Sequence, residues 1–227
     1  MISVIIPTLN EAALLLATLE ALHVNAARPE VIVVDAGSED ATREIAAAAG
    51  ATVLASPRRQ RAAQMNFGAR QSRGEMLLFL HADTRLRPDS LAALERALTR
   101  PGVVGGAFAR RFDHPSRAVR WSCVLADWRC RLTGWFFGDQ AMFARREAFA
   151  ALGGFREWDV FEDIDFARRL RRLGRTVLLG PPILSSGRRF ARGPAWRRVL
   201  GDAWLTWRYA WGADPQAVAA KLKGLRR

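Results

Sequence analysis

The sequence predicts an α/β protein built on a mostly parallel sheet with helices on both faces. The prediction rests on short apolar runs that alternate with segments of helical period, on the short connections between them, and on acidic residues that directly follow the apolar runs. In an open sheet of this kind, ligands bind at the rim formed by the carboxyl ends of the strands. At 227 residues and 50% hydrophobic composition, the chain is long enough for one substantial core.

Compact apolar runs in the N-terminal part predict parallel strands. They are Ile2 to Ile6, Val31 to Val34, Thr52 to Ala55 and Met76 to Leu80. Segments with helical spacing of apolar residues follow them, namely Glu11 to Leu22, Glu39 to Ala49, Ala62 to Arg73 and Pro88 to Leu98. Strand and helix therefore alternate, and residues 1–100 have the pattern of a nucleotide-binding half.

Beyond Pro101 the alternation is looser. Strands are predicted for Val103 to Phe108, Met142 to Ala144 and Thr176 to Leu179, and helices for Ser116 to Leu132, Glu162 to Leu173 and the tail from Pro194. We therefore expect one principal domain of residues 1–193, made of the halves 1–100 and 101–193, with a short helical extension over residues 194–227.

Composition predicts a cytoplasmic location. No apolar run reaches membrane-spanning length, and residues 1–10 are typical of a strand rather than of a secretion signal. Cys123 and Cys130 lie in a predicted helix, where their separation of about 10 Å is too large for a disulfide. We therefore expect both thiols to be reduced and buried.

The formal net charge of +13 leaves rival functions open. One rival is a basic nucleic-acid-binding protein, but the arginines are spread along the chain and no recognised DNA or RNA module is present, so we expect no nucleic acid as a partner. The other is a non-catalytic membrane-surface protein that uses Trp121, Trp128, Trp135 and the tail tryptophans. We expect core packing for most of these rings, with peripheral contact at the inner face of a membrane as the alternative.

Polar residues after the first and second strands are candidates for binding a nucleotide. In the loop Pro7-Thr8-Leu9-Asn10-Glu11, free backbone N–H groups and the side chains of Thr8 and Asn10 offer hydrogen bonds. The alternative is an ordinary helix cap by Asn10. Asp35 at the end of the second strand can accept from a ribose hydroxyl or a base N–H, although an Asp before Gly37 is also common in turns.

Acidic residues elsewhere suggest a metal site and a base. His81 and Asp83 follow the most hydrophobic strand on the same side, where a carboxylate suits Mg²⁺ or Mn²⁺ held against a diphosphate. The alternative is a carboxylate that caps a turn before Arg85. Glu162 and Asp163 open a helix, so pairing of acids with the helix dipole explains them without function. The functional alternative is an ionised carboxylate that accepts a proton late in a reaction.

In order, these segments resemble the inverting glycosyltransferases of family 2, which have a GT-A fold with a Rossmann-like, mostly parallel sheet. The matching residues lie within about residues 1–180 and are Val4-Ile5-Ile6-Pro7-Thr8-Leu9-Asn10-Glu11, Val33-Val34-Asp35-Ala36-Gly37-Ser38, Asn66-Phe67-Gly68-Ala69, Gly74-Glu75, His81-Ala82-Asp83, Phe137-Gly138-Asp139-Gln140, Leu152-Gly153-Gly154-Phe155 and Phe161-Glu162-Asp163. Several motifs in the right order are far more specific than any one alone.

The resemblance implies a sugar transfer with inversion from a nucleoside-diphosphate sugar, UDP- or GDP-linked, to an acceptor hydroxyl, assisted by Mg²⁺ or Mn²⁺. It implies that the nucleotide is held by Pro7, Thr8, Asn10, Glu11 and Asp35. Arg61, from the cluster Arg58-Arg59-Gln60-Arg61, is a further candidate at the nucleotide edge.

The resemblance also implies roles for later residues and makes residues 101–193 the acceptor half. Asp83 ends the metal-binding acidic motif, whose first position is His81 where most members carry Asp. Asp163 is implied to be the base that deprotonates the acceptor hydroxyl. The residues implied to line the sugar and acceptor pocket are Asp139, Gln140 and Glu162.

Arg188 and Arg189 follow the last predicted strand and are expected to close on the diphosphate as a lid. Solvated surface arginines are the alternative. The His-Ala-Asp, Gly-Asp-Gln and Glu-Asp combination with a short helical tail is similar to the soluble subgroup associated with arsenosugar biosynthesis. Because the Gln-x-x-Arg-Trp motif of processive polysaccharide synthases is not found, a single transfer is expected.

Overall fold

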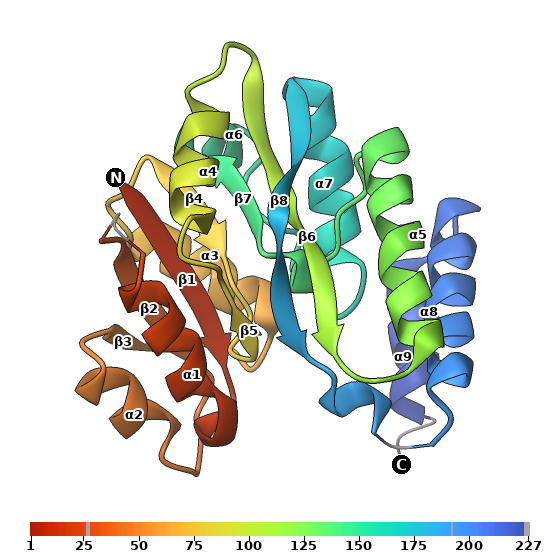
Figure 1. Cartoon of the computed structure of the whole chain (residues 1–227), viewed down its shortest axis with the longest axis horizontal. Coiled ribbons are helices and arrows are strands. Elements are labelled where there is room, and N and C mark those ends of the chain that lie inside the picture. The colour runs from red at the N-terminus through yellow and green to blue at the C-terminus, as the bar shows by residue number, and fades with distance from the viewer. Residues whose placement is uncertain (26–27, 192, 225–227) are drawn as a thin grey trace.

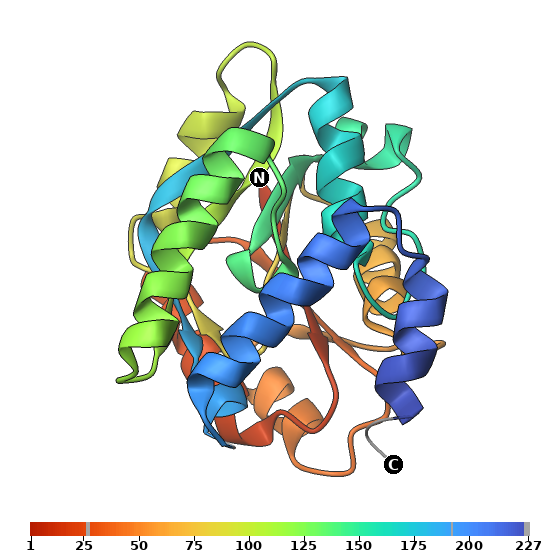
Figure 2. The ribbon, with the colours of Figure 1, turned by 90° about the vertical axis from the view of Figure 1, so that its right-hand side faces the viewer.

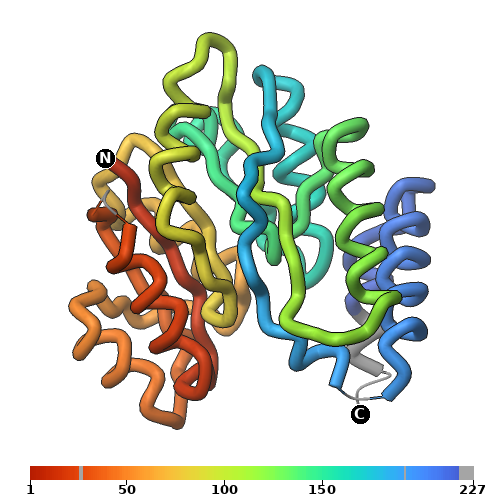
Figure 3. The backbone as a smooth tube through the Cα atoms, viewed as in Figure 1, coloured from red at the N-terminus to blue at the C-terminus, as the bar shows by residue number. Residues whose placement is uncertain are grey.

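The computed structural model describes residues 1–25, 28–191 and 193–224. Over these residues the strands form one eight-stranded sheet with the order β3-β2-β1-β4-β7-β6-β8-β5. Figure 1 shows helices on both faces of this sheet. The backbone trace in Figure 3 shows that α8 (Ala195–Ala210) lies beside α5 (Arg117–Thr133), on the side away from β1. The α/β class with a mostly parallel, Rossmann-like sheet is therefore confirmed.

The N-terminal strands pair in parallel, as the alternation of strand and helix predicts. They are β1 (Ile2–Thr8), β2 (Glu30–Asp35), β3 (Thr52–Ala55) and β4 (Met76–Phe79). The helices that connect them are α1 (Ala12–His23), α2 (Thr42–Ala48) and α3 (Arg61–Gln71). In this register Thr8 lies opposite Asp35, so the residues that end β1 and β2 are neighbours at one rim.

The later strands bring a second set of residues to the same rim. They are β5 (Thr84–Arg85), β6 (Val103–Asp113), β7 (Met142–Arg145) and β8 (Arg175–Ser186). Because β7 runs antiparallel to β4, its first residue, Met142, pairs with the last residue of β4, Phe79. The short 3₁₀ turn η1 (Gly138–Gln140) before β7 therefore lies at the carboxyl end of β4.

The sheet separates distinct hydrophobic layers, because successive strand residues point to opposite faces. Val4 and Ile6 pack with α1, α2 and α4 (Ser90–Leu98), whereas Ile5 packs with the other layer. The helices of that second layer are α3, α6 (Arg146–Ala151) and α7 (Glu162–Leu173). Cover on both faces makes the strands near-continuous apolar runs and leaves the rim as the place for polar side chains.

Several predicted boundaries differ from the structure. The helix expected from Glu39 begins only at Thr42, because the Asp40 carboxylate accepts a hydrogen bond from the Thr42 amide at 3.1 Å and so ends the preceding loop. The strands expected to end at Phe108 and Leu179 continue to Asp113 and Ser186 and pair with each other along most of their length. Polar residues in these extensions hide the strands from a reading of apolar runs.

The remaining helices are α5 (Arg117–Thr133), η2 (Arg188–Phe190), α8 (Ala195–Ala210) and α9 (Pro215–Gly224). Cys123 and Cys130 on α5 are free and buried, as expected. The expectation that most tryptophans pack in the core is wrong, since six of the rings are exposed, namely Trp121, Trp128, Trp196, Trp204, Trp207 and Trp211. In the part of the chain described, no helix combines the length and apolar character needed to cross a bilayer.

Candidate functional site

The ends of β1 and β2 place Thr8 and Asp35 side by side at the carboxyl rim. Thr8 Oγ1 donates to Asp35 Oδ2 at 3.1 Å, and the amides of Gly37 and Ser38 donate to Oδ1 at 3.0 and 2.8 Å. The Ser38 hydroxyl also donates to Oδ2. Burial tends to raise the pKa of Asp35, but these hydrogen bonds, led by those from Ser38, outweigh it and hold the pKa below its ordinary value. Asp35 is therefore a buried carboxylate that stays ionised.

The loop after β1 is tied to the loop after β2 rather than used as a helix cap. Asn10 has a left-handed φ of 54°, which Asn tolerates better than most residues. Its amide donates to Ser38 Oγ at 2.8 Å, and its side-chain oxygen accepts from the Glu39 amide at 2.9 Å. The interpretation of Asn10 as an ordinary cap of α1 is thus wrong, because its side chain bonds to the neighbouring loop.

Gln64 on α3 also holds this part of the rim. Its buried amide nitrogen donates to the carbonyls of Thr8 at 2.9 Å and Val34 at 2.7 Å, which lie at the ends of the adjacent strands β1 and β2. Pro7 lies one residue before Thr8, opposite Val34 in the register. The paired strand ends are thereby fixed from the α3 side.

Asp83 and Glu11 lie on either side of one guanidinium. Arg188 on η2 donates from Nη2 to Glu11 Oε1 at 2.7 Å, and its Nε lies 3.3 Å from Asp83 Oδ2. Burial raises the pKa of Asp83, the positive charge of Arg188 opposes this, and the charges of Glu11 and Asp139 add to it. The three acids are therefore close enough to interact, and Arg188 lies at this rim between Glu11 and Asp83.

His81 is held neutral although Asp139 is close to it. Burial first, and then the positive charge of Arg61, lower its pKa to about 3. Arg61 Nη1 lies 3.4 Å from His81 Nε2. A neutral imidazole keeps a lone pair on one ring nitrogen, so His81 is in the form that can bind a cation.

Asp163 is the second residue of α7 and lies beside this histidine. Its Oδ2 accepts from the Gly138 amide at 2.6 Å and its Oδ1 from the Ile164 amide at 2.7 Å. A Cβ placed on Gly138 would lie 3.1 Å from His81 Nε2 and 3.4 Å from Asp163 Oδ2, so both side chains flank this glycine. Burial, and then the charge of Glu162, raise the pKa of Asp163 to about 6.

Glu162, next to Asp163, binds the guanidinium of Arg61. Arg61 donates to Glu162 Oε1 from Nη2 at 2.5 Å and from Nε at 2.9 Å, and the glutamate is almost fully buried. Arg61 therefore contacts both His81 and Glu162. Phe161, the residue before α7, has a left-handed φ of 65°, a strained conformation for a large side chain that sets the direction of these acids.

The η1 turn adds Asp139 and Gln140. Asp139 forms a buried ion pair with Arg110 of β6, and Arg189 lies 3.8 Å from the same carboxylate. Burial would raise the pKa of Asp139, but the charge of Arg110 lowers it overall. Gln140 is fully buried, where its Oε1 accepts from the Phe137 amide at 3.0 Å. From that position Gln140 holds the turn and does not face the rim acids.

Some carboxylate oxygens at the rim have no hydrogen-bond partner among the described residues, although they are buried. They are Glu11 Oε2, Asp139 Oδ1 and Glu162 Oε2. Such oxygens are costly unless a ligand or water meets them. Within the described ranges, no three His, Cys, Asp or Glu side chains form a ready metal cage. Magnesium-like ions, however, are commonly held by only one or two carboxylates together with substrate phosphates. Asp83 fits this pattern as the carboxylate, and a neutral His81 would add a nitrogen ligand.

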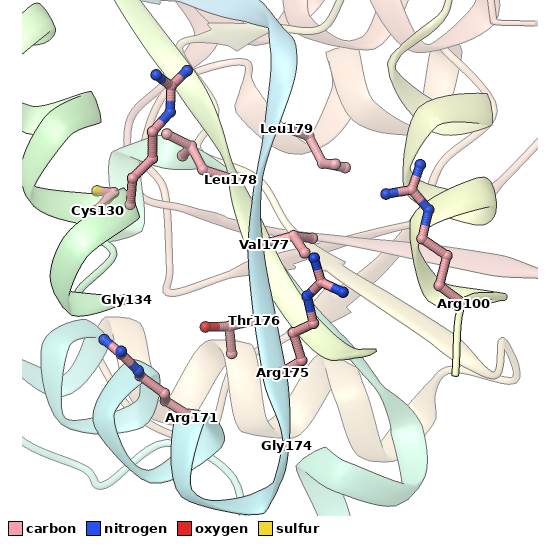
Figure 4. Close-up of a pocket in the computed structure, with 11 residues that line it drawn as sticks. Arg100, Cys130, Gly134, Arg171, Gly174, Arg175, Thr176, Val177, Leu178 and Leu179 are labelled. Carbon is pink, nitrogen blue, oxygen red and sulfur yellow. The ribbon is translucent and has the colours of Figure 1, made fainter. Parts of the chain in front are cut away.

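Hollows also exist away from this rim. One of about 460 Å³ lies beside the amino-terminal part of β8, and Figure 4 shows Arg100 and Arg175 on one side of the strand and Arg171 with Cys130 on the other. Because the amino end of β8 is opposite to the rim that carries the acids, this hollow is separate from the candidate site.

Arg110 was not predicted from the sequence, although an arginine inside a mostly buried strand is a signal that one of its neighbours is acidic. We expect Arg110→Met to lower the free energy of unfolding by about 3 kcal/mol, because Asp139 is left buried without its main cation. Urea denaturation measures this value. The matched control is Arg111→Met, which removes the partner of the buried Asp127. Because the Arg111 side chain is 40% exposed, water screens this pair more than the Arg110–Asp139 pair, and we expect a smaller loss of about 1 kcal/mol. Equal losses in both variants would contradict the prediction.

The model of the family described as Glycosyl transferase family 2 matches residues 3–153. A mannosyltransferase from Pyrobaculum calidifontis, solved in complex with GDP-Man and Mn²⁺, is 25% identical with a TM-score of 0.69, over 88% of this chain and 60% of that one. No curated protein sequence matches the chain.

More distant structures show the same fold. Residues 1–349 of Staphylococcus aureus TarS are 19% identical with a TM-score of 0.66, over 82% of this chain and 60% of that one. Glucosyl-3-phosphoglycerate synthase from Mycobacterium tuberculosis, solved with Mn²⁺, UDP and glucosyl-3-phosphoglycerate, is 23% identical with a TM-score of 0.63, over 88% of this chain and 77% of that one. The chain thus spans only 60% of the length of the mannosyltransferase and of the TarS fragment.

Proposed function

The chain belongs to glycosyl transferase family 2, and we propose that it moves a sugar from a nucleoside-diphosphate sugar to a hydroxyl group of an acceptor with inversion at the anomeric carbon. The observation that supports this most is the arrangement of the rim. Asp163 and His81 flank Gly138, and Asp83 and Glu11 flank Arg188, at the same carboxyl edge as Thr8 and Asp35. The similar mannosyltransferase, which has the same fold, was solved in complex with GDP-Man and Mn²⁺.

In this proposal the loops after β1 and β2 hold the nucleotide. Pro7, Thr8, Asn10, Glu11 and Asp35 border one edge. Arg61 on α3 contacts His81 and Glu162 and would approach the nucleotide from their side. Asp35 already accepts from Thr8, Gly37 and Ser38, which fills the lone-pair positions of a carboxylate. A base or ribose donor therefore reaches Asp35 when the hydroxyl of Thr8 or Ser38 turns to another acceptor.

Asp83 and His81 are the residues that would hold a divalent metal. A bound Mg²⁺ or Mn²⁺ would stabilise the negative charge that grows on the departing diphosphate. Arg188 lies against Asp83, and in this proposal its guanidinium would pair with the diphosphate. Arg189 lies between Asp139 and Asp202 of α8 and would support the same side.

Asp163 is the proposed base. The acceptor oxygen forms a bond to the anomeric carbon while its proton passes to the Asp163 carboxylate, and the bond from that carbon to the diphosphate oxygen breaks with its electron pair. Attack opposite the leaving group inverts the configuration, and no covalent intermediate forms. A pKa of about 6 leaves Asp163 ionised at neutral pH yet more basic than an ordinary carboxylate. The Gly138 and Ile164 amides hold it in place.

The acceptor side of the site is proposed to lie between η1 and α7, bordered by Asp139 and Glu162. Both have a buried carboxylate oxygen without a partner among the described residues, which a sugar hydroxyl could satisfy as a donor. Gln140, also predicted to line this pocket, would act through the backbone of the turn, because its side chain is buried. The shape of the pocket, rather than these contacts, decides which acceptor is recognised. The arsenosugar subgroup therefore stays a prediction from the resemblance.

The division into residues 1–193 and 194–227 stays a prediction. The Arg189–Asp202 pair and the Phe161–Tyr209 ring contact, with centroids 4.7 Å apart, join α8 to the residues around Asp163. The proposed extension would therefore act as one wall of the acceptor side. A cytoplasmic location likewise stays a prediction.

A thermal-shift screen of UDP-, GDP- and dTDP-sugars with and without Mn²⁺ tests the function. We expect one nucleotide to raise the melting temperature by several degrees when Mn²⁺ is present, because a ligand at about a hundred times its Kd adds about 2.7 kcal/mol to native stability. A chain that responds to none of them, yet binds a random oligonucleotide with strong salt dependence, would instead be a nucleic-acid-binding protein.

A further inference from the structure

Helix α8 exposes a single stripe of large apolar side chains. Its members recur every three or four residues and are Trp196, Leu200, Trp204, Trp207 and, at the C-cap, Trp211. At 100° per residue they fall within one sector of the helix. All are at least half exposed, and Trp211 is 77% exposed. A monomeric protein rarely exposes so many large apolar rings to water on one face.

Helix α5 carries a second stripe of the same kind. It consists of Trp121, Val124, Leu125, Trp128 and Leu132, with both tryptophans about two-thirds exposed, at 66% and 67%. The helices contact each other. In Figure 2 α5 (green) and α8 (blue) both run across the side of the molecule that faces the viewer. We call the two stripes and the arginines beside them the α5–α8 face.

The charges on the α5–α8 face are of one sign. Exposed arginines border the stripes, namely Arg117, Arg120 and Arg131 on α5 and Arg197 and Arg208 on α8. The single acid of α5, Asp127, is buried and pairs with Arg111 at 2.8 Å. The single acid of α8, Asp202, pairs with Arg189. Both acids are thus used on the inner side, and the outer side presents guanidinium groups and apolar rings.

A shallow hollow lies within this face. Its volume is about 360 Å³, and Arg117, Arg120, Trp121 and Val124 line it. Neighbouring guanidinium groups beside an indole ring provide donors for an anionic phosphate and a surface for its apolar attachment. Arg197 and Arg208 on α8 lie over the rings of Trp196 and Trp204, at 5.3 and 5.2 Å from the centroids, so charge and ring are also paired there.

We propose that the α5–α8 face binds the surface of an anionic lipid bilayer. A lipid surface supplies both of the required components, phosphate groups for the arginines and an acyl boundary for tryptophan and leucine. A second copy of the chain would bring arginines against arginines, and a nucleic acid would leave the aliphatic residues of both stripes without a partner. The inference goes beyond the proposed sugar transfer and does not depend on it.

Docking on this face would orient the candidate site. Asp202 and Tyr209 lie on the side of α8 opposite to the tryptophan stripe, since they are offset by about half a turn from it. From that side they contact Arg189 and Phe161, next to Asp139 and Asp163. One helix therefore has lipid on one side and the proposed acceptor region on the other, which suits an acceptor held at the membrane surface.

Vesicle flotation with the full chain tests the proposal. We expect the protein to float with vesicles of phosphatidylcholine and phosphatidylglycerol and much less with phosphatidylcholine alone. The pair Trp128→Gln and Trp207→Gln should lower the bound fraction about tenfold, and Arg117→Gln with Arg120→Gln should remove the preference for anionic lipid. Quenching of tryptophan fluorescence by brominated lipid should report insertion of the rings in the unmodified chain and not in the tryptophan variant.

Matched controls separate the face from general stickiness and charge. Leu16→Gln on α1 removes an exposed leucine, and Arg96→Gln on α4 removes an exposed arginine, both outside the α5–α8 face, and neither should change flotation. Circular dichroism and nucleotide thermal shifts on every variant show whether it is folded and whether the site is intact. Absence of flotation with anionic vesicles would overturn the proposal. A dimer seen by sedimentation equilibrium in the unmodified chain, but not in the tryptophan variant, would instead indicate an interface between two copies. Oligonucleotide binding that the arginine variant loses, with no lipid binding in the unmodified chain, would also overturn the proposal.

Discussion

Asp163→Asn is expected to lower the rate of sugar transfer by at least about a hundredfold while nucleoside diphosphate still binds. Asparagine keeps the size of the side chain and an oxygen that can accept from the Gly138 amide, so the geometry survives. It cannot take the proton of the acceptor hydroxyl. Release of nucleoside diphosphate in the presence of acceptor measures the rate, and calorimetry measures the binding. Turnover at the unmodified rate would show that another group is the base.

The same variant has a stability signature. The pKa of Asp163 is raised in the folded chain to about 6 from an ordinary 3.8, so ionisation disfavours the folded state. Stability is therefore lost as pH rises from the ordinary pKa to the raised one. We expect the Asn variant to melt a few degrees higher than the unmodified chain above pH of about 7, with the difference gone in acid, where Asp163 is protonated.

Asp165→Asn is the matched control for that measurement. Asp165 lies two residues along α7 and pairs with Arg169 at 2.7 Å and with Arg156 at 3.3 Å, away from Gly138 and His81. Loss of these pairs should lower the melting temperature at neutral pH, the opposite sign to Asp163→Asn. If both variants shift in the same direction, the raised pKa of Asp163 is not the cause.

Asp83→Ala is expected to remove the effect of Mn²⁺ on nucleoside diphosphate binding, with a loss of affinity of at least about tenfold when the metal is present. The reason is that His81 stands where a second carboxylate is common, so Asp83 is the principal oxygen ligand available at this position. Calorimetric titration with nucleoside diphosphate, with and without Mn²⁺, measures the change.

The control for this experiment is Asp89→Ala at the start of α4, an exposed aspartate whose side chain makes no capping bond. It should leave both titrations unchanged. If the Asp83 variant retains the full effect of Mn²⁺, Asp83 is not a metal ligand. Glu11 and Asp139, which have buried oxygens without a partner among the described residues, would then be the candidates.

The sequence predicted the N-terminal strands well because each is a short apolar run, although β1 continues through Pro7 to Thr8. It predicted too short an extent for β6 and β8, whose later residues, such as Arg110 and Ser185, are polar yet buried. Those residues are stabilised by partners distant in the chain. Arg110 meets Asp139, 29 positions away, and periodicity carries no information about such a pair.

The same limit explains the positions of other site residues. The contact of Arg188 with Glu11 joins residues 177 positions apart, so only the folded sheet brings them together. The motif order was sufficient to place Asp83 and Asp163 at one rim, but it could not show that Gln140 turns inward or that the tryptophans of α5 and α8 face outward. Amphipathic spacing tells which residues share a helix face and not whether that face meets protein or solvent.

Arg188 is an internal counter-ion for two acids of the rim. Its guanidinium spans Glu11 and Asp83, so an incoming metal must compete with a positive charge that is already in place. A bound diphosphate would pair with Arg188 and leave Asp83 free for the metal. A bound metal at Asp83 would in turn leave Arg188 free for the diphosphate. Their affinities are then thermodynamically linked, each strengthening the other by the same factor. The metal alone should therefore bind weakly, and its affinity should rise when the nucleoside diphosphate is also bound.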